Sequence, residues 1–192
     1  MSNLLARNKI WIMVIIFALP ALLALTVFML RDQLNLTSKS EGFLLTPPLA
    51  LEMLQLTTVD NAPVKADTFA NHWWLIYLTP PSCTDECGTQ NAKLRSVYLA
   101  LTKNMSRVQR IMLAQENALT PEQLQQAAAD KPLLIEKIAN PEYLLSNCSV
   151  ATNEGLFIMD PLGNIMLCYA PQQEAHAILQ DIEKLLKASR IG

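Results

Sequence analysis

The longest apolar stretch of the chain runs from Ile10 to Leu30 and contains no charged residue. At ~1.5 Å per residue a helix of this length is about 31 Å long, which is enough to cross a bilayer. The basic residues Arg7 and Lys9 precede it, whereas the single Arg31 beyond it is followed by an acid. The positive-inside rule therefore predicts that the N-terminus is cytoplasmic and that the rest of the chain is exported.

A cleavable signal peptide is the alternative interpretation of this stretch. The apolar region of such a peptide usually spans only ~7–15 residues and ends in a small-x-small site. The run here is longer and ends in Phe28-Met29-Leu30, so we expect an uncleaved, single-pass anchor in the inner membrane. Polar residues and a Pro pair follow it, as is typical of a tether. The expected organisation is a cytoplasmic N-terminus (1–9), a transmembrane anchor (10–31), a tether (32–48) and a periplasmic domain (49–192).

The exported part alternates between strand-like and helix-like patterns. A continuous apolar run of strand length, Trp73–Leu78, is typical of a central strand buried on both faces. Apolar residues at helical spacing predict helices that follow it, and a Thr-Pro-Glu-Gln segment at residue 120 is a strong helix start. The expected elements are strands at 54–57, 73–78 and 108–114, helices at 91–101, 120–129 and 173–188, a short strand and helix within 131–148, and a hairpin of strands 156–159 and 165–169.

That order predicts an α/β fold of the thioredoxin-like class, a βαβ unit followed by a β-hairpin and a C-terminal helix. About 160 residues beyond the anchor suit one domain with an ordinary core. The formal net charge of −2, without any Lys/Arg cluster, gives no electrostatic footprint for nucleic acid. Neither a phosphate-binding loop, nor a Ser/His/Asp arrangement, nor paired catalytic carboxylates are visible, so the sequence offers no support for a hydrolase or a nucleotide-binding protein.

Cys83 and Cys87 carry the clearest chemistry in the chain. They stand four residues apart between the Trp73–Leu78 strand and the next helix, which would place both on one face of its first turn. The unpaired amides and the dipole of a helix N-terminus favour thiolate over thiol. Such a pair can cycle between dithiol and disulfide, with a Cα separation near the upper end of the permitted ~4.4–6.8 Å, or hold a soft metal such as Cu(I).

Cys148 and Cys168 leave three interpretations open. Cys148 precedes the strand that lies beside the cysteine pair in thioredoxin-like folds, so it is a candidate third thiolate for Cu(I). The two cysteines can instead form a structural disulfide, or Cys168 can be a small core residue. His72 lies about 20 Å from the cysteine end of its strand, at ~3.3 Å per residue, and His176 is expected on the surface of the last helix.

Five stretches of the exported part carry a resemblance to a known family: 54–57, Trp74-Leu75-Ile76-Tyr77, Cys83-x-Asp85-x-Cys87, Val108-Gln109-Arg110-Ile111 and Ile158-Met159-Asp160-Pro161-Leu162-Gly163. On these stretches the exported part resembles the Sco family of membrane-anchored copper chaperones for cytochrome c oxidase. The resemblance implies Cu(I) ligation by Cys83 and Cys87, and it covers most of the domain. The chain departs from the family where Thr84 and Gly88 replace a Pro after each cysteine, and where Thr152 replaces the family's ligand His. The Val-Asp-Pro segment that the family tends to show is also replaced, by Gln115-Glu116-Asn117.

Three functions follow as hypotheses. The domain is an assembly factor that delivers Cu(I), or maintains thiol redox state, for a cytochrome c oxidase subunit or another oxidase assembly factor. Alternatively it is a periplasmic thiol–disulfide oxidoreductase, or a non-catalytic interaction scaffold in which Cys83 and Cys87 form a permanent staple. The segment before the Leu156 strand lacks the Pro that oxidoreductases of this fold usually carry there, whereas Pro80 and Pro81 restrict the loop and position the thiols.

Overall fold

The structure is a computed structural model, and it describes residues 2–30, 40–189 and 191. Two separate units are present, a helix α1 (Ser2–Leu30) and an α/β domain that begins at Ser40. The helix α1 covers the expected anchor and has Pro20 in its interior. A search of the described residues finds no helix that is both long and apolar enough to cross a membrane. The first part of the expected tether, residues 32–39, lies outside the described residues.

Seven strands of the domain form one mixed sheet with the order β1-β7-β6-β3-β4-β5-β2. At its centre β3 (Trp73–Leu78) pairs in parallel with β4 (Val108–Ala114), which pairs in parallel with β5 (Leu133–Ile138). The hairpin of β6 (Gly155–Met159) and β7 (Asn164–Tyr169) joins the other side of β3 in antiparallel orientation. The expected central strand, parallel βαβ unit and terminal hairpin are therefore confirmed.

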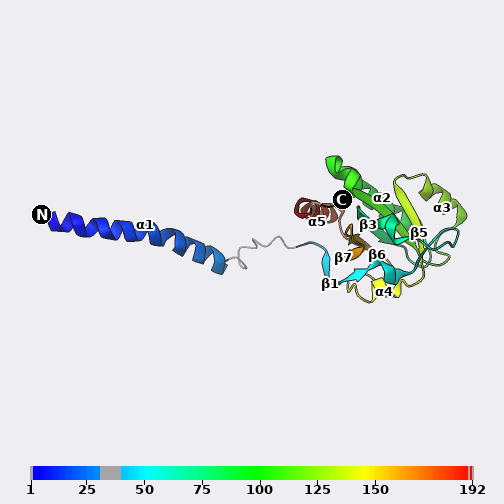
Figure 1. Ribbon diagram of the computed structural model, residues 1–192. Coiled ribbons are helices and arrows are strands. Elements are labelled where there is room, and N and C mark those ends of the chain that lie inside the picture. Colours follow the sequence, from blue (N-terminus) through cyan, green and yellow to red (C-terminus); the bar gives the residue numbers. More distant parts are fainter. Residues whose placement is uncertain (1, 31–39, 190, 192) are drawn as a thin grey trace. The chain divides into compact units, whose positions relative to one another are not determined.

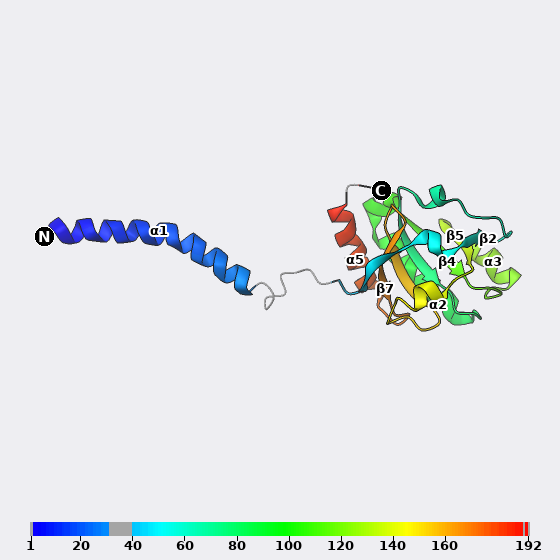
Figure 2. The same ribbon diagram turned by 60° about the horizontal axis from the view of Figure 1, so that its bottom comes forward.

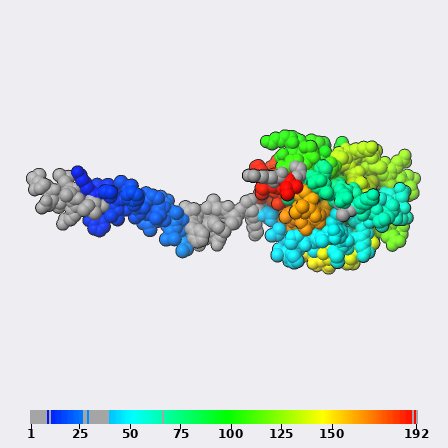
Figure 3. Space-filling view, in the orientation of Figure 1, coloured from blue at the N-terminus to red at the C-terminus, as the bar shows by residue number. Residues whose placement is uncertain are grey.

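Helices cover both faces of this sheet (Figures 1 and 2). The long helices α2 (Asp85–Ala100) and α5 (Ala175–Ala188) lie side by side on one face, as the green and red surfaces of Figure 3 also show. The opposite face carries the short helix α4 (Glu142–Leu145) and the single turn η1 (Leu51–Leu54). Because side chains of a strand alternate, β3 sends Trp73, Leu75 and Tyr77 into the α2/α5 core and Trp74, Ile76 and Leu78 into the other.

The helix α3 (Pro121–Ala128) packs along β5 and begins as the sequence predicts. Thr120 accepts a hydrogen bond from the backbone N–H of Gln123, and the side chain of Gln123 accepts one from the backbone of Thr120. This capping box satisfies two of the amides that a helix N-terminus leaves unpaired. The helix start is therefore set locally by four consecutive residues.

The expected tether, residues 32–48, overlaps the α/β domain, which begins at Ser40. Strand β1 (Phe43–Ala50) pairs antiparallel with β7 and buries Leu45 and Leu49. The carboxylate of Asp181 in α5 accepts hydrogen bonds from the backbone N–H groups of Glu41 and Gly42, at 2.8 and 2.9 Å. The Pro pair that suggested a tether is tolerated because β1 is an edge strand and needs no donor on its open side. The short strand β2 (Leu56–Thr58) forms the other edge.

Candidate functional site

Cys83 and Cys87 meet where β3 leads into α2. The helix begins at Asp85, so Cys83 precedes it and only Cys87 lies in its first turn. Thr84 is extended, with φ −104° and ψ −166°, and turns the chain into the helix. The two Cα atoms lie 5.5 Å apart and the sulfurs form a disulfide. The expectation that both cysteines share one helical turn is therefore corrected, because the extended Thr84 carries Cys83 off the helix.

The two sulfur-bearing residues differ in exposure. Cys87 is only 5 % exposed and packs in the α2/α5 core, whereas Cys83 is partly exposed at its margin. The backbone N–H of Cys83 donates to the carbonyl of Ala118 at 3.0 Å, and the Gln123 side chain donates to the carbonyl of Cys83 at 3.4 Å. Cys83 is thus held in place by its backbone and remains partly exposed at the margin of the core.

A buried polar pair lies in the same core as Cys87. The Tyr77 hydroxyl of β3 donates to Glu154 Oε2 at 2.7 Å, and Glu154 is 9 % exposed directly before β6. Burial, and then the hydrogen bond that Tyr77 donates to Glu154, raise the pKa of Tyr77. Burial also lowers the pKa of Lys93, which donates to the carbonyl of Pro171, although the charge of Glu154 opposes that shift.

Sequence reasoning did not identify the Tyr77–Glu154 pair. A hydroxyl inside an otherwise apolar strand was the only available signal, since a buried phenol usually needs a hydrogen-bond partner. Glu154 stands immediately before β6, the position at which the sequence analysis expected a Pro in an oxidoreductase. A carboxyl group that accepts a hydrogen bond therefore occupies that position in this chain.

Cys148 and Cys168 form the second disulfide, on the opposite face of the sheet. Cys148 follows α4, Cys168 lies on β7, and their Cα atoms are 6.2 Å apart. The residues are 1 % and 0 % exposed and pack with Leu144, Phe157 and Ile165. The structure therefore does not bring Cys148 to the Cys83–Cys87 pair, and its interpretation as a third Cu(I) ligand is corrected: it is bonded to Cys168 in the other core.

The remaining sequence candidates, His72, His176 and Thr152, hydrogen-bond to residues other than the two cysteines. His176 is exposed at the start of α5 and shares a hydrogen bond with Gln180, whereas His72 lies before β3. Thr152 is exposed in the loop between α4 and β6, where its hydroxyl donates to Asn153. Across residues 2–30, 40–189 and 191, no group of three or more His, Cys, Asp or Glu side chains is arranged to hold a metal ion.

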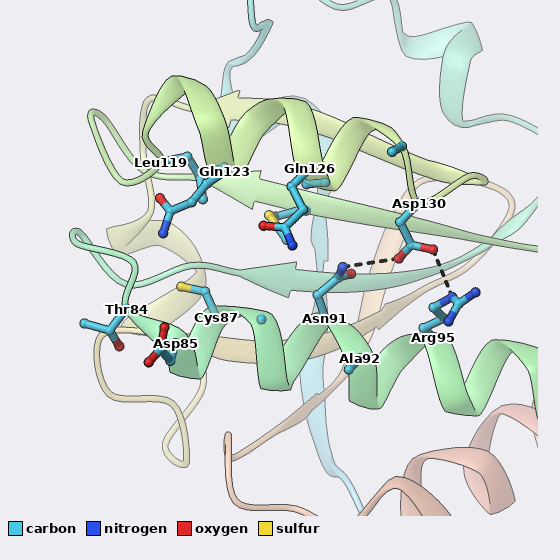
Figure 4. Close-up of a pocket in the computed structure, with 14 residues that line it drawn as sticks. Thr84, Asp85, Cys87, Asn91, Ala92, Arg95, Leu119, Gln123, Gln126 and Asp130 are labelled. Atoms are coloured by element: carbon cyan, nitrogen blue, oxygen red, sulfur yellow. Dashed lines mark hydrogen bonds and ion pairs between the residues drawn. The ribbon is translucent and has the colours of Figure 1, made fainter.

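A groove of about 600 Å³ opens beside Cys87, between α2 and α3 (Figure 4). At its far end Asp130 forms ion pairs with Arg95 and Arg110, at 3.0 Å each. The hydrogen bond from Arg110 lowers the pKa of Asp130, which keeps this carboxylate ionised. Sequence reasoning did not find this groove, because it depends on how two helices separated by a strand face one another.

The domain is similar to several solved Sco structures. They include the apo Sco1 protein from Thermus thermophilus (18% identity, TM-score 0.57, 78% of this chain and 98% of that one) and copper-bound yeast Sco1 (16%, 0.55, 79% and 96%). A third is BsSco, described as a member of the Sco family of cytochrome c oxidase assembly proteins (15%, 0.53, 81% and 100%). At such identities the similarity shows the fold alone.

The comparison with curated proteins finds no match. A protein-family model, in contrast, matches residues 73–189, which is more than half of the chain and includes both cysteine pairs. With the Sco structures, this match confirms the predicted thioredoxin-like α/β fold. The chain therefore belongs to the family described as transmembrane-like, thioredoxin-like, C-terminal domain.

Proposed function

We propose that the domain is a thiol–disulfide exchange protein in which Cys83 and Cys87 cycle between dithiol and disulfide. The observation that carries this proposal is the difference in exposure within the pair at the start of α2, with Cys83 partly exposed and Cys87 in the core. A thiol that is accessible at a helix N-terminus suits attack on a partner, and an inner thiol within bonding reach suits release of that partner.

The exchange proceeds in two balanced steps. The thiolate of reduced Cys83 attacks one sulfur of a partner disulfide, forms a mixed disulfide and releases the partner's other sulfur as a thiolate. The thiolate of Cys87 then attacks the Cys83 sulfur, closes the Cys83–Cys87 bond and releases the second partner thiolate. The partner gains two electrons and the domain loses two; a dithiol reductant returns the pair to its starting state.

The cellular setting of this chemistry is part of the proposal. The uncharged run from Ile10 to Leu30 supports an inner-membrane anchor with the domain in the periplasm, where disulfide chemistry operates. The resemblance to Sco proteins supports an oxidase subunit, or another oxidase assembly factor, as the partner. The domain would keep the partner's cysteines reduced while the oxidase is assembled.

A redox titration of the full-length chain in detergent tests the exchange proposal. Glutathione buffers of increasing potential, with alkylation and mass spectrometry, report each cysteine pair separately. The Cys83–Cys87 pair is expected to reduce reversibly above about −300 mV, the range below which structural disulfides usually lie. A pair that is reduced only when the domain unfolds would instead identify a permanent staple and support the scaffold hypothesis.

A trapping experiment tests the partner. In Cys87→Ser the second step cannot occur, so the mixed disulfide on Cys83 accumulates and its partner can be identified. We expect an oxidase subunit or assembly factor, and Cys83→Ser is the control that should trap nothing. Capture of unrelated exported proteins by Cys87→Ser alone would contradict the oxidase assignment and support a general oxidoreductase.

Cu(I) binding is the second candidate function. Two thiolates suit a soft monovalent ion, and copper-bound yeast Sco1 shares this fold. Cys83 and Cys87 would hold the ion as cargo, with no ligand from Cys148, which is bonded to Cys168. An anaerobic Cu(I) titration against a calibrated chelator tests this candidate. Delivery would be supported if Cys83→Ser and Cys87→Ser each lose the copper while a Cys148→Ser/Cys168→Ser variant keeps it. Equal copper retention in all variants would exclude the pair as a copper site.

A further inference from the structure

We propose that the groove between α2 and α3 binds the partner segment that carries the reactive cysteine, and that this segment is an extended peptide with an acidic side chain three to four residues from that cysteine. The inference rests on the proposed thiol–disulfide function and adds the chemistry of the partner. The evidence for it is the difference between the two ends of the groove: Cys87 lies at one end, and Arg95 with Asp130 at the other.

The groove has two facing rows of side chains (Figure 4). On α2, residues four apart lie on one face of the helix, and the corresponding face of α3 opposes them. Each row therefore runs from the disulfide to the ion cluster at the far end. The rows are Cys87, Asn91 and Arg95 on α2, and Gln123, Gln126 and Asp130 in and after α3.

The length of the groove sets the spacing in the peptide. Arg95 lies eight positions after Cys87, which corresponds to about 12 Å along a helix at ~1.5 Å per residue. An extended chain rises ~3.3 Å per residue, so about three to four of its residues span that distance. The groove is lined by Cys87, whose Cα lies 5.5 Å from that of the attacking Cys83. A peptide whose cysteine lies at this end, next to Cys83, would therefore place its third or fourth neighbour beside Arg95.

The walls between the two ends suit a peptide main chain. Gln126 carries a carboxamide that makes no hydrogen bond within the described residues, so it can both donate to and accept from a peptide group. The carboxamides of Asn91 and Gln123 also line the walls, but Asn91 already bonds to Asp130, and Gln123 to Thr120 and to the carbonyl of Cys83. Met112 of β4 and Leu119 add apolar contacts. This mixture favours an extended polypeptide over a purely apolar ligand.

The far end carries the charge that selects the acidic side chain. Arg95 and Arg110 share the single carboxylate of Asp130, so this cluster has an excess of one positive charge. Arg110 is 1 % exposed, but the Arg95 side chain is 57 % exposed and binds Asp130 through Nε, one of its five N–H donors. The cysteine end is lined by Asp85 and repels an acid there. A carboxylate on the peptide is therefore favoured at Arg95 and disfavoured next to the cysteine.

Peptide binding tests the docking site independently of exchange. The probes are labelled octapeptides with Ser in place of Cys and with Glu, Gln or Lys four residues away, in both chain directions. With the full-length oxidised chain in detergent, we expect the Glu peptide of one direction to bind roughly two- to fivefold more tightly than its Gln counterpart, as for an exposed ion pair. High salt should remove the difference.

Variants of the chain identify the residue responsible. Arg95→Gln should abolish the preference for Glu, and Arg95→Glu should reverse it toward the Lys peptide. Lys187→Gln, which removes an exposed cation of α5 outside the groove, is the matched control and should keep the preference. Equal affinity for the Glu, Gln and Lys peptides in the unmodified chain would overturn the proposal without any appeal to the variants.

A second arm separates this inference from the proposed function. The same peptides with Cys, as mixed disulfides with glutathione, report reduction by the domain. Preferential Glu binding without reduction of any peptide would support the docking site and refute the exchange function. Reduction of all peptides at equal rates, with equal binding, would support exchange and overturn the docking site.

Discussion

The two disulfides of the domain are the same bond in two different surroundings. Cys83–Cys87 closes over four residues at the edge of the α2/α5 core, with Cys83 partly exposed. Cys148–Cys168 closes over twenty residues inside the other core, with both residues almost wholly buried. Access to an attacking thiolate decides whether a disulfide exchanges, so the first pair suits chemistry and the second suits stability.

Two buried carboxyl groups, one on each face of the sheet, also differ in their hydrogen bonding. On the side of Cys87, Glu154 accepts a hydrogen bond from Tyr77. Glu136 of β5 lies on the same strand face as Leu134 and Ile138, which is the side of Cys148. Its Oε2 has no hydrogen-bond partner among the described residues. Of these two carboxyl groups, Glu154 on the side of the accessible disulfide therefore has a hydrogen-bond donor, whereas Oε2 of Glu136 on the side of the buried disulfide has none within the described residues.

The largest expected effect separates the disulfides by activity. Cys83→Ser should reduce thiol–disulfide exchange to the level of buffer alone, because the attacking sulfur is gone. Cys148→Ser with Cys168→Ser should leave the rate unchanged, since these residues lie in the other core. Reduction of a small peptide disulfide by the prereduced full-length chain measures both. A loss of rate in the second variant, with the fold intact by circular dichroism, would contradict the division of roles.

The next effect separates the disulfides by stability. Removal of Cys148–Cys168 in a Cys148→Ala/Cys168→Ala variant should lower the free energy of unfolding by about 3 kcal/mol, since this bond closes the longer loop. The shorter Cys83–Cys87 loop should contribute less, about 2 kcal/mol in Cys83→Ala/Cys87→Ala. Urea denaturation under non-reducing conditions measures both differences. A larger loss in the Cys83/Cys87 variant would show that the accessible pair is the structural one.

Patterns within a few residues predicted most of the fold. The apolar run of β3 and the Thr120 capping box depend on neighbours in sequence, and both have the expected form. Strand β1 escaped prediction because its evidence is not local: two prolines mark its sequence as irregular, while its pairing partner in β7 lies more than a hundred residues away. For that reason the sequence alone placed the start of the domain at residue 49, whereas the structure places it at Ser40.

The candidate site was predictable only as a pair of residues. The spacing of Cys83 and Cys87 identified the chemistry, but which of them is exposed depends on where α2 begins. The separation of Cys148 from this pair depends on which face of the sheet each loop reaches. Contacts of this kind, like that of Tyr77 with Glu154, join elements distant in sequence and leave no short pattern.

A pH titration of stability sharpens the comparison of the carboxyl groups. Burial raises the pKa of Glu136 to about 7 from 4.5. Between these values the unfolded chain is ionised at this position and the folded chain is not, so stability should fall as pH rises from 4.5 through 7. At about 1.4 kcal/mol per pKa unit the full fall is about 3.5 kcal/mol, of which about 3 kcal/mol occurs between pH 4.5 and pH 8.

Urea denaturation at pH 4.5 and at pH 8 measures this fall, and Glu136→Gln should remove it. Glu142→Gln, which removes an exposed carboxylate of α4, is the matched control for the loss of one charge. An unchanged difference between the two pH values in Glu136→Gln would assign the fall to other groups.

The smallest expected effect concerns the satisfied carboxyl group. Tyr77→Phe removes the hydroxyl that Glu154 accepts and leaves the buried acid without that donor, so we expect a loss of about 1–2 kcal/mol of stability. Tyr143→Phe is the control, since its hydroxyl has no hydrogen bond within the described part of the chain. If the pair acts as a unit, Tyr77→Phe combined with Glu154→Leu should cost less than the sum of the single losses. Additive losses would mean that the hydrogen bond contributes nothing beyond packing, and the contrast with Glu136 would then rest on burial alone.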